Sequence, residues 1–104
     1  MTTAHVLTAA AEADLRSIIR YTRQQWGDAQ TRRYIADLTK GIEQIAIGQG
    51  RWKDLSSLYP GLRMARCQQH FLFCLPRNGE PALIIAILHQ RMDLIARLSS
   101  RLTQ

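Results

Sequence analysis

The run "HFLFCLPRNGEPALIIAILHQRMD", residues 70–93, decides the fold of this chain. Residues 70–75 alternate between two apolar faces, residues 76–81 form a turn with an Asn-Gly pair at its tip, and residues 82–88 are apolar throughout. An Asn-Gly pair between two apolar runs is a hairpin signal. A strand that is apolar on both faces belongs in the interior of a sheet. The stretch therefore predicts an antiparallel hairpin whose second strand is central.

A third strand and an apolar loop precede this hairpin. Residues 62–67 alternate side chains with the period of a strand, and a tight Gln68-Gln69 connection leads onward. We expect residues 51–62 to form a loop with a turn at Pro60-Gly61. Its apolar side chains either fold over the sheet edge or form a pocket for a partner segment. They are Trp52, Leu55, Leu58 and Tyr59.

A short strand and two antiparallel helices are predicted before the loop. Residues 5–8 read as a strand, and Thr8 suits the N-cap of the first helix. Gly27 suits a left-handed position at the end of that helix, and Asp28 suits the N-cap of the next, residues 29–47. Apolar residues recur at helical spacing in both. The recurring positions are Ala11, Leu15, Ile18 or Ile19, Thr22 and Trp26 in the first helix, then Ile35, Leu38, Ile42 and Ile45 in the second.

The chain closes with residues 92–102, which read as a short amphipathic helix burying Leu94, Ile95 and Leu98. The predicted order is β-α-α-β-β-β-α in a single domain, residues 1–104. This order indicates an α+β fold, with a helical hairpin packed on one face of a mainly antiparallel sheet.

The chain is basic, with a net charge of +6, and 12 of its 14 basic residues are arginine. Arginine makes planar, two-pronged contacts with carboxylates and phosphates, which favours an acidic protein or a nucleic acid as partner. Residues 62–104 carry 6 basic and 2 acidic side chains, against 8 and 6 in residues 1–61. We therefore expect the working surface in the C-terminal half.

The two cysteines, Cys67 and Cys74, are expected to be buried free thiols in a reducing cytoplasm, with a cross-strand disulfide as the alternative. No histidine stands at metal-ligand spacing from them, so we expect neither a metal nor a cofactor. The longest apolar run is too short to cross a membrane, and no signal peptide is recognisable.

Three segments of the sequence resemble one protein family. They are "LTAAAEADLRSIIRYTRQQWG" (7–27), "RRYIADLTKGIEQIA" (32–46) and "LYPGLRMARCQQHFLFCLPRNGEPALIIAILHQRMDL" (58–94). These segments resemble the ParE toxins of type II toxin–antitoxin pairs, in the RelE/ParE superfamily. The strand, turn and strand followed by "ILHQRMD" are the specific part, and the likeness covers nearly the whole chain.

The resemblance implies a toxin without enzymatic activity. ParE toxins bind bacterial DNA gyrase and block replication, and a ParD antitoxin neutralises them by laying an amphipathic segment over them. Such a complex contacts operator DNA only through the antitoxin, and plasmid-borne pairs kill cells that lose the plasmid. A homodimer and a heterotetramer with antitoxin both remain open.

Basic and apolar residues are the candidates for these two contacts. For the antitoxin we expect an amphipathic helix in the apolar groove of the hairpin, with acidic residues meeting arginines. The gyrase candidates are Arg63, His89, Arg91 and Arg97. The antitoxin candidates are Leu15, Ile19, Trp26, Tyr34, Leu38, Trp52, Leu58, Tyr59 and Arg66. Trp26 is also expected to anchor the hairpin, and Arg63 and Arg66 to face opposite sides of their strand.

Three interpretations of "HQRMD", residues 89–93, stay open. Its polar side chains contact a partner, or they stabilise the fold, with Asp93 capping the last helix or pairing with Arg91 or Arg66. The third is a ribosome-dependent mRNA endonuclease of the RelE type, with histidine as the proton-transfer group. This alternative draws on Arg63, Arg66, His70, His89 and Arg91. The scarcity of lysine argues against it.

Overall fold

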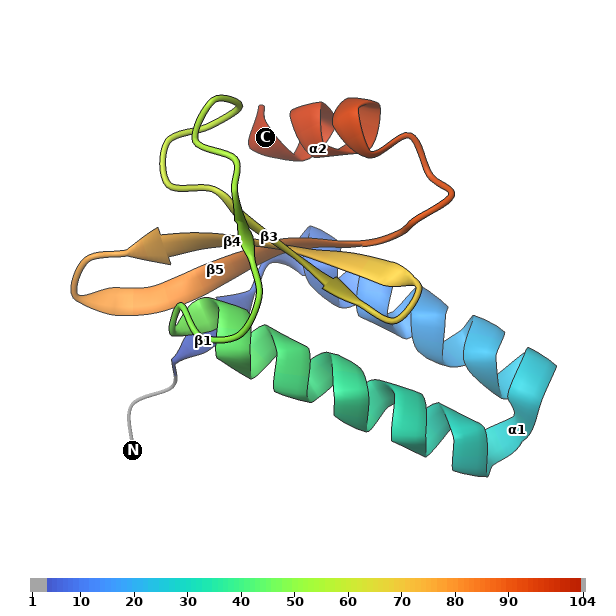
Figure 1. Cartoon of the computed structure of the whole chain (residues 1–104). Coiled ribbons are helices and arrows are strands. Elements are labelled where there is room, and N and C mark those ends of the chain that lie inside the picture. Colours follow the sequence, from blue (N-terminus) through green and yellow to red (C-terminus); the bar gives the residue numbers. More distant parts are fainter. Residues whose placement is uncertain (1–3, 104) are drawn as a thin grey trace.

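The computed structural model describes residues 4–103 and contains a five-stranded sheet with helices on both faces (Figure 1). Its elements are β1 (His5–Leu7), α1 (Ala9–Ala46), β2 (Lys53–Asp54), β3 (Arg63–Cys67), β4 (His70–Arg77), β5 (Glu80–His89) and α2 (Leu94–Leu102). The strand order is β1-β5-β4-β3-β2, with β1 parallel to β5 and the other pairs antiparallel. The predicted α+β fold and the central position of β5 are confirmed. The short β2 lies within the expected loop, where it pairs with the edge of β3.

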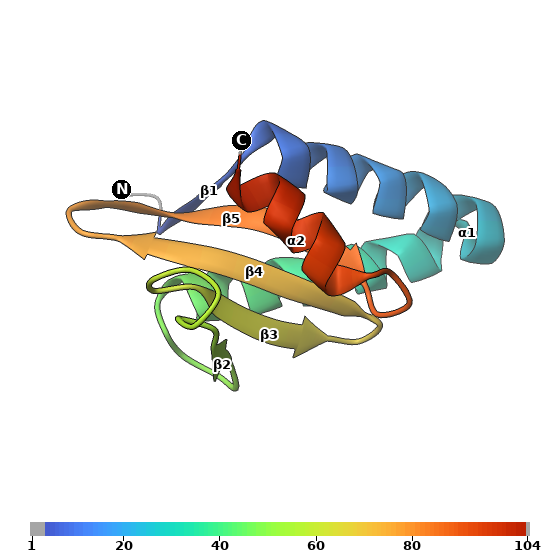
Figure 2. The same cartoon turned by 90° about the horizontal axis from the view of Figure 1, so that it is seen from above.

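Helices α1 and α2 lie on opposite faces of the sheet (Figures 1 and 2), and each covers its own hydrophobic layer. The layer under α1 includes Leu38, Ile42, Ile45, Leu72, Cys74, Ile84 and Ile87. The layer under α2 includes Leu62, Phe73, Ile85, Ala86, Leu88 and Leu98. β4 supplies both layers because its alternate residues face opposite sides, as the sequence predicts. The single helix α2 thus protects a second core that the hairpin does not reach.

Helix α1 is divided at Gly27, whose φ of 82° and ψ of 176° reverse the chain and create the hairpin. The positive φ agrees with the prediction, although the extended ψ is not the left-handed helical value expected. The Thr31 hydroxyl donates to the Gly27 carbonyl over 2.7 Å and closes the turn. The Asp28 carboxylate lies 3.1 Å from Arg23 Nε on the surface of the same turn.

Of the three predicted N-caps, those of Thr8 and Asp93 are present, whereas the Asp28 carboxylate pairs with Arg23 and caps no described amide. Thr8 Oγ1 accepts from the Ala11 amide at 3.2 Å, and Asp93 Oδ1 accepts from the Ala96 amide at 3.3 Å. Such caps satisfy amides that have no partner within the helix. In α2, Leu98 is buried as expected, but Ile95 is 60% exposed. The prediction for Ile95 is wrong, because the face of α2 that meets the sheet passes through Leu98 instead.

A bulge in β5 changes the alternation of its side chains. Cys74 pairs with Ile84 whereas Phe73 pairs with Ala86, which leaves Ile85 as an extra residue. Ile85 and Ala86 therefore both belong to the α2 layer. β1 pairs with β5 only as far as Ile84, so the backbone beyond that residue has no neighbouring strand on this side.

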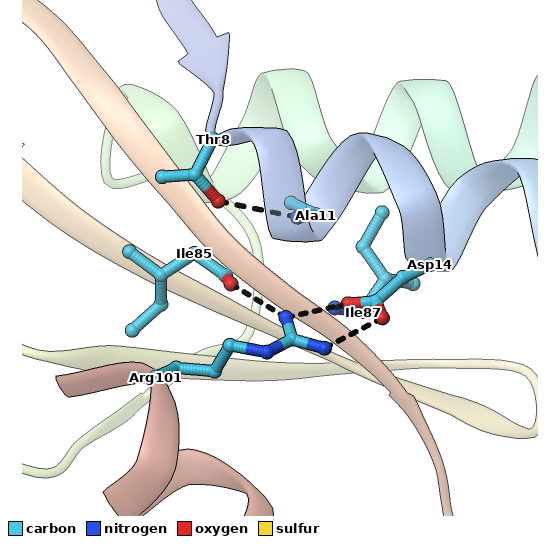
Figure 3. Close-up of polar contacts among 6 residues, drawn as sticks. All are labelled: Thr8, Ala11, Asp14, Ile85, Ile87 and Arg101. Atoms are coloured by element: carbon cyan, nitrogen blue, oxygen red, sulfur yellow. Dashed lines mark hydrogen bonds and ion pairs between the residues drawn. The ribbon is translucent and has the colours of Figure 1, made fainter. Parts of the chain in front are cut away.

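The side chains of Asp14 and Arg101 occupy this open edge (Figure 3). Asp14 Oδ2 accepts from the Ile87 amide at 3.0 Å, and Arg101 Nη1 donates to the Ile85 carbonyl at 2.9 Å. The two side chains join each other through contacts of 2.7 and 2.8 Å, at 15% and 17% exposure. The hydrogen bond that Arg101 donates to Asp14 also raises the pKa of Arg101. The pair thus connects α1 on one face with α2 on the other.

Cys67 and Cys74 are both free thiols. Cys67 pairs across the strands with His70, and Cys74 pairs with Arg63. The disulfide alternative is therefore wrong, since the two residues occupy opposite ends of the β3–β4 pair. Burial raises the pKa of the Cys74 thiol to about 11, so it stays protonated. Between residues 4 and 103, no helix has the length and apolar character needed to cross a membrane.

Candidate functional site

An open groove of about 610 Å³ lies between the two halves of the hairpin. Isoleucine and alanine side chains give it apolar surface, while two arginines, a lysine and one glutamate give it charge. Its lining residues are Ile19, Arg23, Thr31, Arg32, Ile35, Ala36, Thr39, Lys40 and Glu43. An apolar groove with a basic rim fits an amphipathic segment with acidic flanks. The predicted groove of the hairpin is therefore present.

Some of the antitoxin candidates are exposed at the surface, and others are buried in the core. Ile19 lines the groove as expected. Leu38 is fully buried in the α1 layer, so its prediction as a contact is wrong. Leu15 is half-buried against that layer. Trp26 is 69% exposed and anchors nothing, because it lies directly before the break at Gly27, at the end of the hairpin that projects past the sheet (Figure 2).

The C-terminal end of α1 is contacted by Trp52, from the loop that follows it, and by Arg63, the first residue of β3. The Arg63 guanidinium lies 4.5 Å from the centre of the Trp52 ring, and Nη1 donates to the Ile45 carbonyl at 3.1 Å. Trp52 Nε1 donates to the Gly48 carbonyl. Arg63 therefore caps the C-terminus of α1, a favourable place for a cation. Its prediction as an exposed gyrase contact is wrong, whereas Leu58 and Tyr59 are exposed beside it.

Two histidines and a tyrosine meet at the opposite end of the sheet. His70 and His89 are paired across β4 and β5, with ring centroids 5.1 Å apart. The Tyr34 hydroxyl of α1 lies 2.5 Å from His70 Nδ1, so this antitoxin candidate contacts the protein's own sheet. His89 Nδ1 accepts from the Arg91 amide at 3.1 Å, which leaves the proton on Nε2, 3.4 Å from Gln69 Oε1.

Burial, together with the smaller effect of the neighbouring His89, lowers the pKa of His70 from 6.5 to about 4. His70 is therefore neutral near pH 7. Its contact with Tyr34 and its 9% exposure leave it little access to a substrate. Of the residues considered for catalysis, the structure brings His70 and His89 together and separates Arg63 from them.

The depressed pKa of His70 predicts a dependence of stability on pH. The unfolded chain takes up a proton near pH 6.5 that the folded chain takes up only near pH 4. Acid therefore favours the unfolded state throughout this window, and the free energy of unfolding falls as the pH is lowered through it. We expect His70→Gln to flatten the decline, measured by urea unfolding between about pH 7 and pH 5.

His89→Gln serves as the matched control for this prediction, because it retains the buried imidazole at position 70. It should keep most of the decline. Carboxylates that titrate over the same range contribute equally to all three proteins. Parallel curves for the unmodified chain and His70→Gln would contradict the prediction.

Arg66 and its neighbours form the polar rim beyond the histidines. Arg66 Nε donates to the Gln68 carbonyl at 3.1 Å, and Nη2 donates to Gln90 Oε1 at 2.7 Å. Arg66 faces the α2 side of β3 and Arg63 the α1 side, as their spacing predicts. The proposed pairing of Arg66 with Asp93 is wrong, since Asp93 caps α2.

Arg91 and Arg97 are exposed, and His89 is half-buried. Over residues 4–103, Arg91 forms no ion pair with Asp93, which corrects that part of the stabilising interpretation. Of the gyrase candidates, Arg91 and Arg97 therefore keep a free guanidinium at the surface, on the segment that follows β5.

Free positive charge is not concentrated in the C-terminal half, and the role of that half as the working surface stays a prediction. Four of its arginines donate to groups of the protein itself: Arg63, Arg66, Arg77 and Arg101. In contrast, the guanidiniums of Arg16, Arg20 and Arg32 on the hairpin make no hydrogen bond or ion pair with the described part of the chain, and all three residues are exposed. Strand ends and sheet edges offer carbonyls to arginine, whereas the outer face of a helix does not.

Comparison with known proteins identifies the family. The family model described as ParE toxin of type II toxin–antitoxin system, parDE, matches residues 6–94. The chain is 66% identical over 100 residues to Toxin ParE of Escherichia coli, covering 96% of this chain and 97% of that protein. It is 36% identical over 92 residues to Toxin ParE1 of Caulobacter vibrioides, covering 88% and 94%. The chain therefore belongs to the ParE toxin family of type II toxin–antitoxin systems.

A solved structure shares the fold at low sequence identity. It is described as the chromosomal ParDE TA system from P. aeruginosa. The similarity has a TM-score of 0.64 at 17% identity and covers 85% of this chain and 96% of that one. At this identity the comparison supports the architecture alone.

Proposed function

We propose that this ParE toxin binds bacterial DNA gyrase, blocks replication and is held inactive by a ParD-like antitoxin in the cytoplasm. Family membership carries the proposal, and the groove between the halves of α1 supports the antitoxin part. The toxin acts by binding and not by catalysis. On a plasmid the pair serves post-segregational killing, and operator DNA is contacted through the antitoxin.

The antitoxin in this proposal lays an amphipathic helix along the groove. Its apolar residues meet Ile19 and Ile35, and its acidic residues face Arg23, Arg32 and Lys40. Opposite charges on the rim give specificity and speed of association, while the buried apolar contacts give most of the affinity. The toxin and antitoxin then form a heterotetramer or a simpler complex of the same pair.

A charge placed in the groove is expected to abolish neutralisation and leave toxicity intact. Ile19→Glu puts a carboxylate where an apolar partner residue must be desolvated, which we expect to weaken antitoxin binding by about 100-fold or more. Tyr21→Glu, an exposed site on the same helix outside the groove, is the matched control. Co-expression with the antitoxin should rescue cells that carry Tyr21→Glu but not Ile19→Glu. Equal rescue of both would contradict the proposed site.

The target of the toxin is tested by inducing the chain in bacteria without the antitoxin. We expect DNA synthesis to stop and the SOS response to rise while bulk mRNA stays intact. Purified toxin should also stall gyrase on DNA in the same concentration range. Rapid mRNA cleavage with continuing DNA synthesis would reject gyrase in favour of the endonuclease.

Arg91 is the gyrase candidate with the clearest test. Its backbone amide contacts His89 while its side chain is exposed, so Arg91→Ala should preserve the fold. We expect loss of toxicity with a change in unfolding free energy within about 0.5 kcal/mol, as for ordinary surface substitutions. Arg51→Ala, also exposed, is the control that removes the same charge elsewhere. Unfolding of Arg91→Ala would support the stabilising interpretation instead.

A further inference from the structure

We propose that the outer face of the hairpin is a DNA-binding surface, with arginines on the backbone phosphates and Trp26 against the bases. The surface consists of Arg16, Arg20, Arg23 and Trp26 in the first half of α1, near the turn at Gly27. This is a direct contact of the toxin with DNA, separate from the operator contact made by an antitoxin. The choice of DNA over RNA rests on the proposed gyrase target. The contact of the arginines with phosphates does not depend on that target.

The arginines form one line along the helix. Arg16, Arg20 and Arg23 are spaced by four and three residues, which places them on the same face. This face lies opposite Ala11 and Ile18, the residues of the same helix that are buried in the core against the sheet. Residues 16–33 contain five arginines and one acid, Asp28, which pairs with Arg23. The line therefore carries a net positive charge, and within residues 4–103 Arg16 and Arg20 form no ion pair.

One large aromatic side chain, Trp26, lies near this line, whereas Tyr21 lies on another face of the helix. Trp26 is 69% exposed and Tyr21 is 62% exposed, the two highest values among the large apolar side chains exposed between residues 4 and 103. Trp26 lies three residues after Arg23, so it continues the helix surface toward the turn. This turn projects beyond the ends of the strands (Figures 1 and 2), which leaves its surroundings open to a large partner. An exposed indole stacks on bases irrespective of their sequence.

The composition of the surface favours a nucleic acid over an acidic protein. A stable protein interface needs a desolvated apolar centre, and the arginine line has none between its members. Binding to phosphates needs no apolar centre, because its affinity arises from charge neutralisation and counterion release. Arginine with a nearby indole suits backbone contact plus stacking.

The surface also meets the groove at Arg23, which belongs to both. An antitoxin helix in the groove would engage Arg23 and Arg32 with its acids, and it would place negative charge beside the arginine line. Antitoxin binding would therefore weaken the DNA contact without covering Arg16 or Arg20. Neutralisation would then include an electrostatic component.

The test uses purified full-length toxin and a fluorescent DNA duplex, without gyrase. Arg16→Gln/Arg20→Gln removes two charges at exposed positions outside the groove. We expect binding, measured by anisotropy, to weaken roughly tenfold, and the slope of log K against log salt to fall by about 2. The control Arg51→Gln/Lys53→Gln removes the same charge from the exposed loop and should retain the affinity of the unmodified chain.

The tryptophan contact has its own signal. In a Trp52→Phe background Trp26 is the single tryptophan, and its fluorescence should be quenched when single-stranded DNA, whose bases are open to stacking, is added. A toxin that binds no DNA, equal losses in both charge variants, or at least tenfold tighter binding to an RNA duplex would overturn the proposal. Loss of gyrase binding in Arg16→Gln/Arg20→Gln with no DNA binding by the unmodified toxin would assign the surface to a protein instead. Because gyrase is absent from the binding assay, failure of the proposed target leaves this test unaffected.

Discussion

A chain that ends at Asp93 is expected to lose cooperative folding. Such a chain lacks all of α2, the helix that covers the face of the sheet formed by Phe73, Ile85 and Leu88. It also lacks Arg101 and leaves Asp14 without its cation at the open edge of β5. A domain of this size is stable by only about 5–15 kcal/mol, and the exposed apolar face alone removes a large part of that.

Circular dichroism and urea unfolding measure this effect, and the soluble yield gives a first indication. Within the complete chain, Leu98→Ala isolates the packing of α2 and should cost about 2–5 kcal/mol, as for other buried leucines. Ile95→Ala, one turn earlier and 60% exposed, should cost far less. A truncated chain with a sharp unfolding transition near that of the full chain would refute the role given to α2.

Breaking the pair of Asp14 and Arg101 is expected to produce the second large effect. Either single substitution, Asp14→Asn or Arg101→Met, leaves a poorly hydrated charge and a backbone group of β5 with fewer partners. Each should cost about 2–4 kcal/mol, a little below the range for fully buried pairs. The double variant should be less destabilised than the sum, with a coupling energy of about 1–3 kcal/mol.

The surface pair of Arg23 and Asp28 provides the matched control, at 64% and 69% side-chain exposure. Arg23→Met and Asp28→Asn should show coupling close to zero, because solvent screens exposed pairs. Urea unfolding of the four proteins in each cycle measures both values. Additive effects in the Asp14–Arg101 cycle would show that the two residues act independently.

The sequence predicted the elements of the fold because each has a strong local cause. The Asn-Gly turn, the doubly apolar strand and the capping side chains of Thr8 and Asp93 act within a few residues. Gly27 marked the reversal of the hairpin for the same reason. The exact ends of the strands and the short β2 depend on pairing with a neighbour, so periodicity located them less well.

Individual side chains were harder to place, because their environment is made by distant segments. Arg63 was predicted to be a surface cation and Arg101 was not singled out, yet their guanidiniums donate to the carbonyls of Ile45 and Ile85. The sequence contains only a weak indication that Asp14 is partly buried. Asp14 lies three residues after Ala11 and four before Ile18, beside the buried stripe of the helix. Trp26 was predicted to anchor the helical hairpin, because residue spacing alone cannot reveal that the sheet ends before the helix does.

The bulge in β5 and the early end of β1 leave part of β5 without a neighbouring strand in the free toxin. A strand with unfilled amides and carbonyls invites an extended chain to pair with it, including another copy of the same protein. The carboxylate of Asp14 and the guanidinium of Arg101 occupy those positions on β5 and place charge where a new strand would have to lie. The toxin thus carries its own barrier against strand-to-strand association during the interval in which no antitoxin is bound.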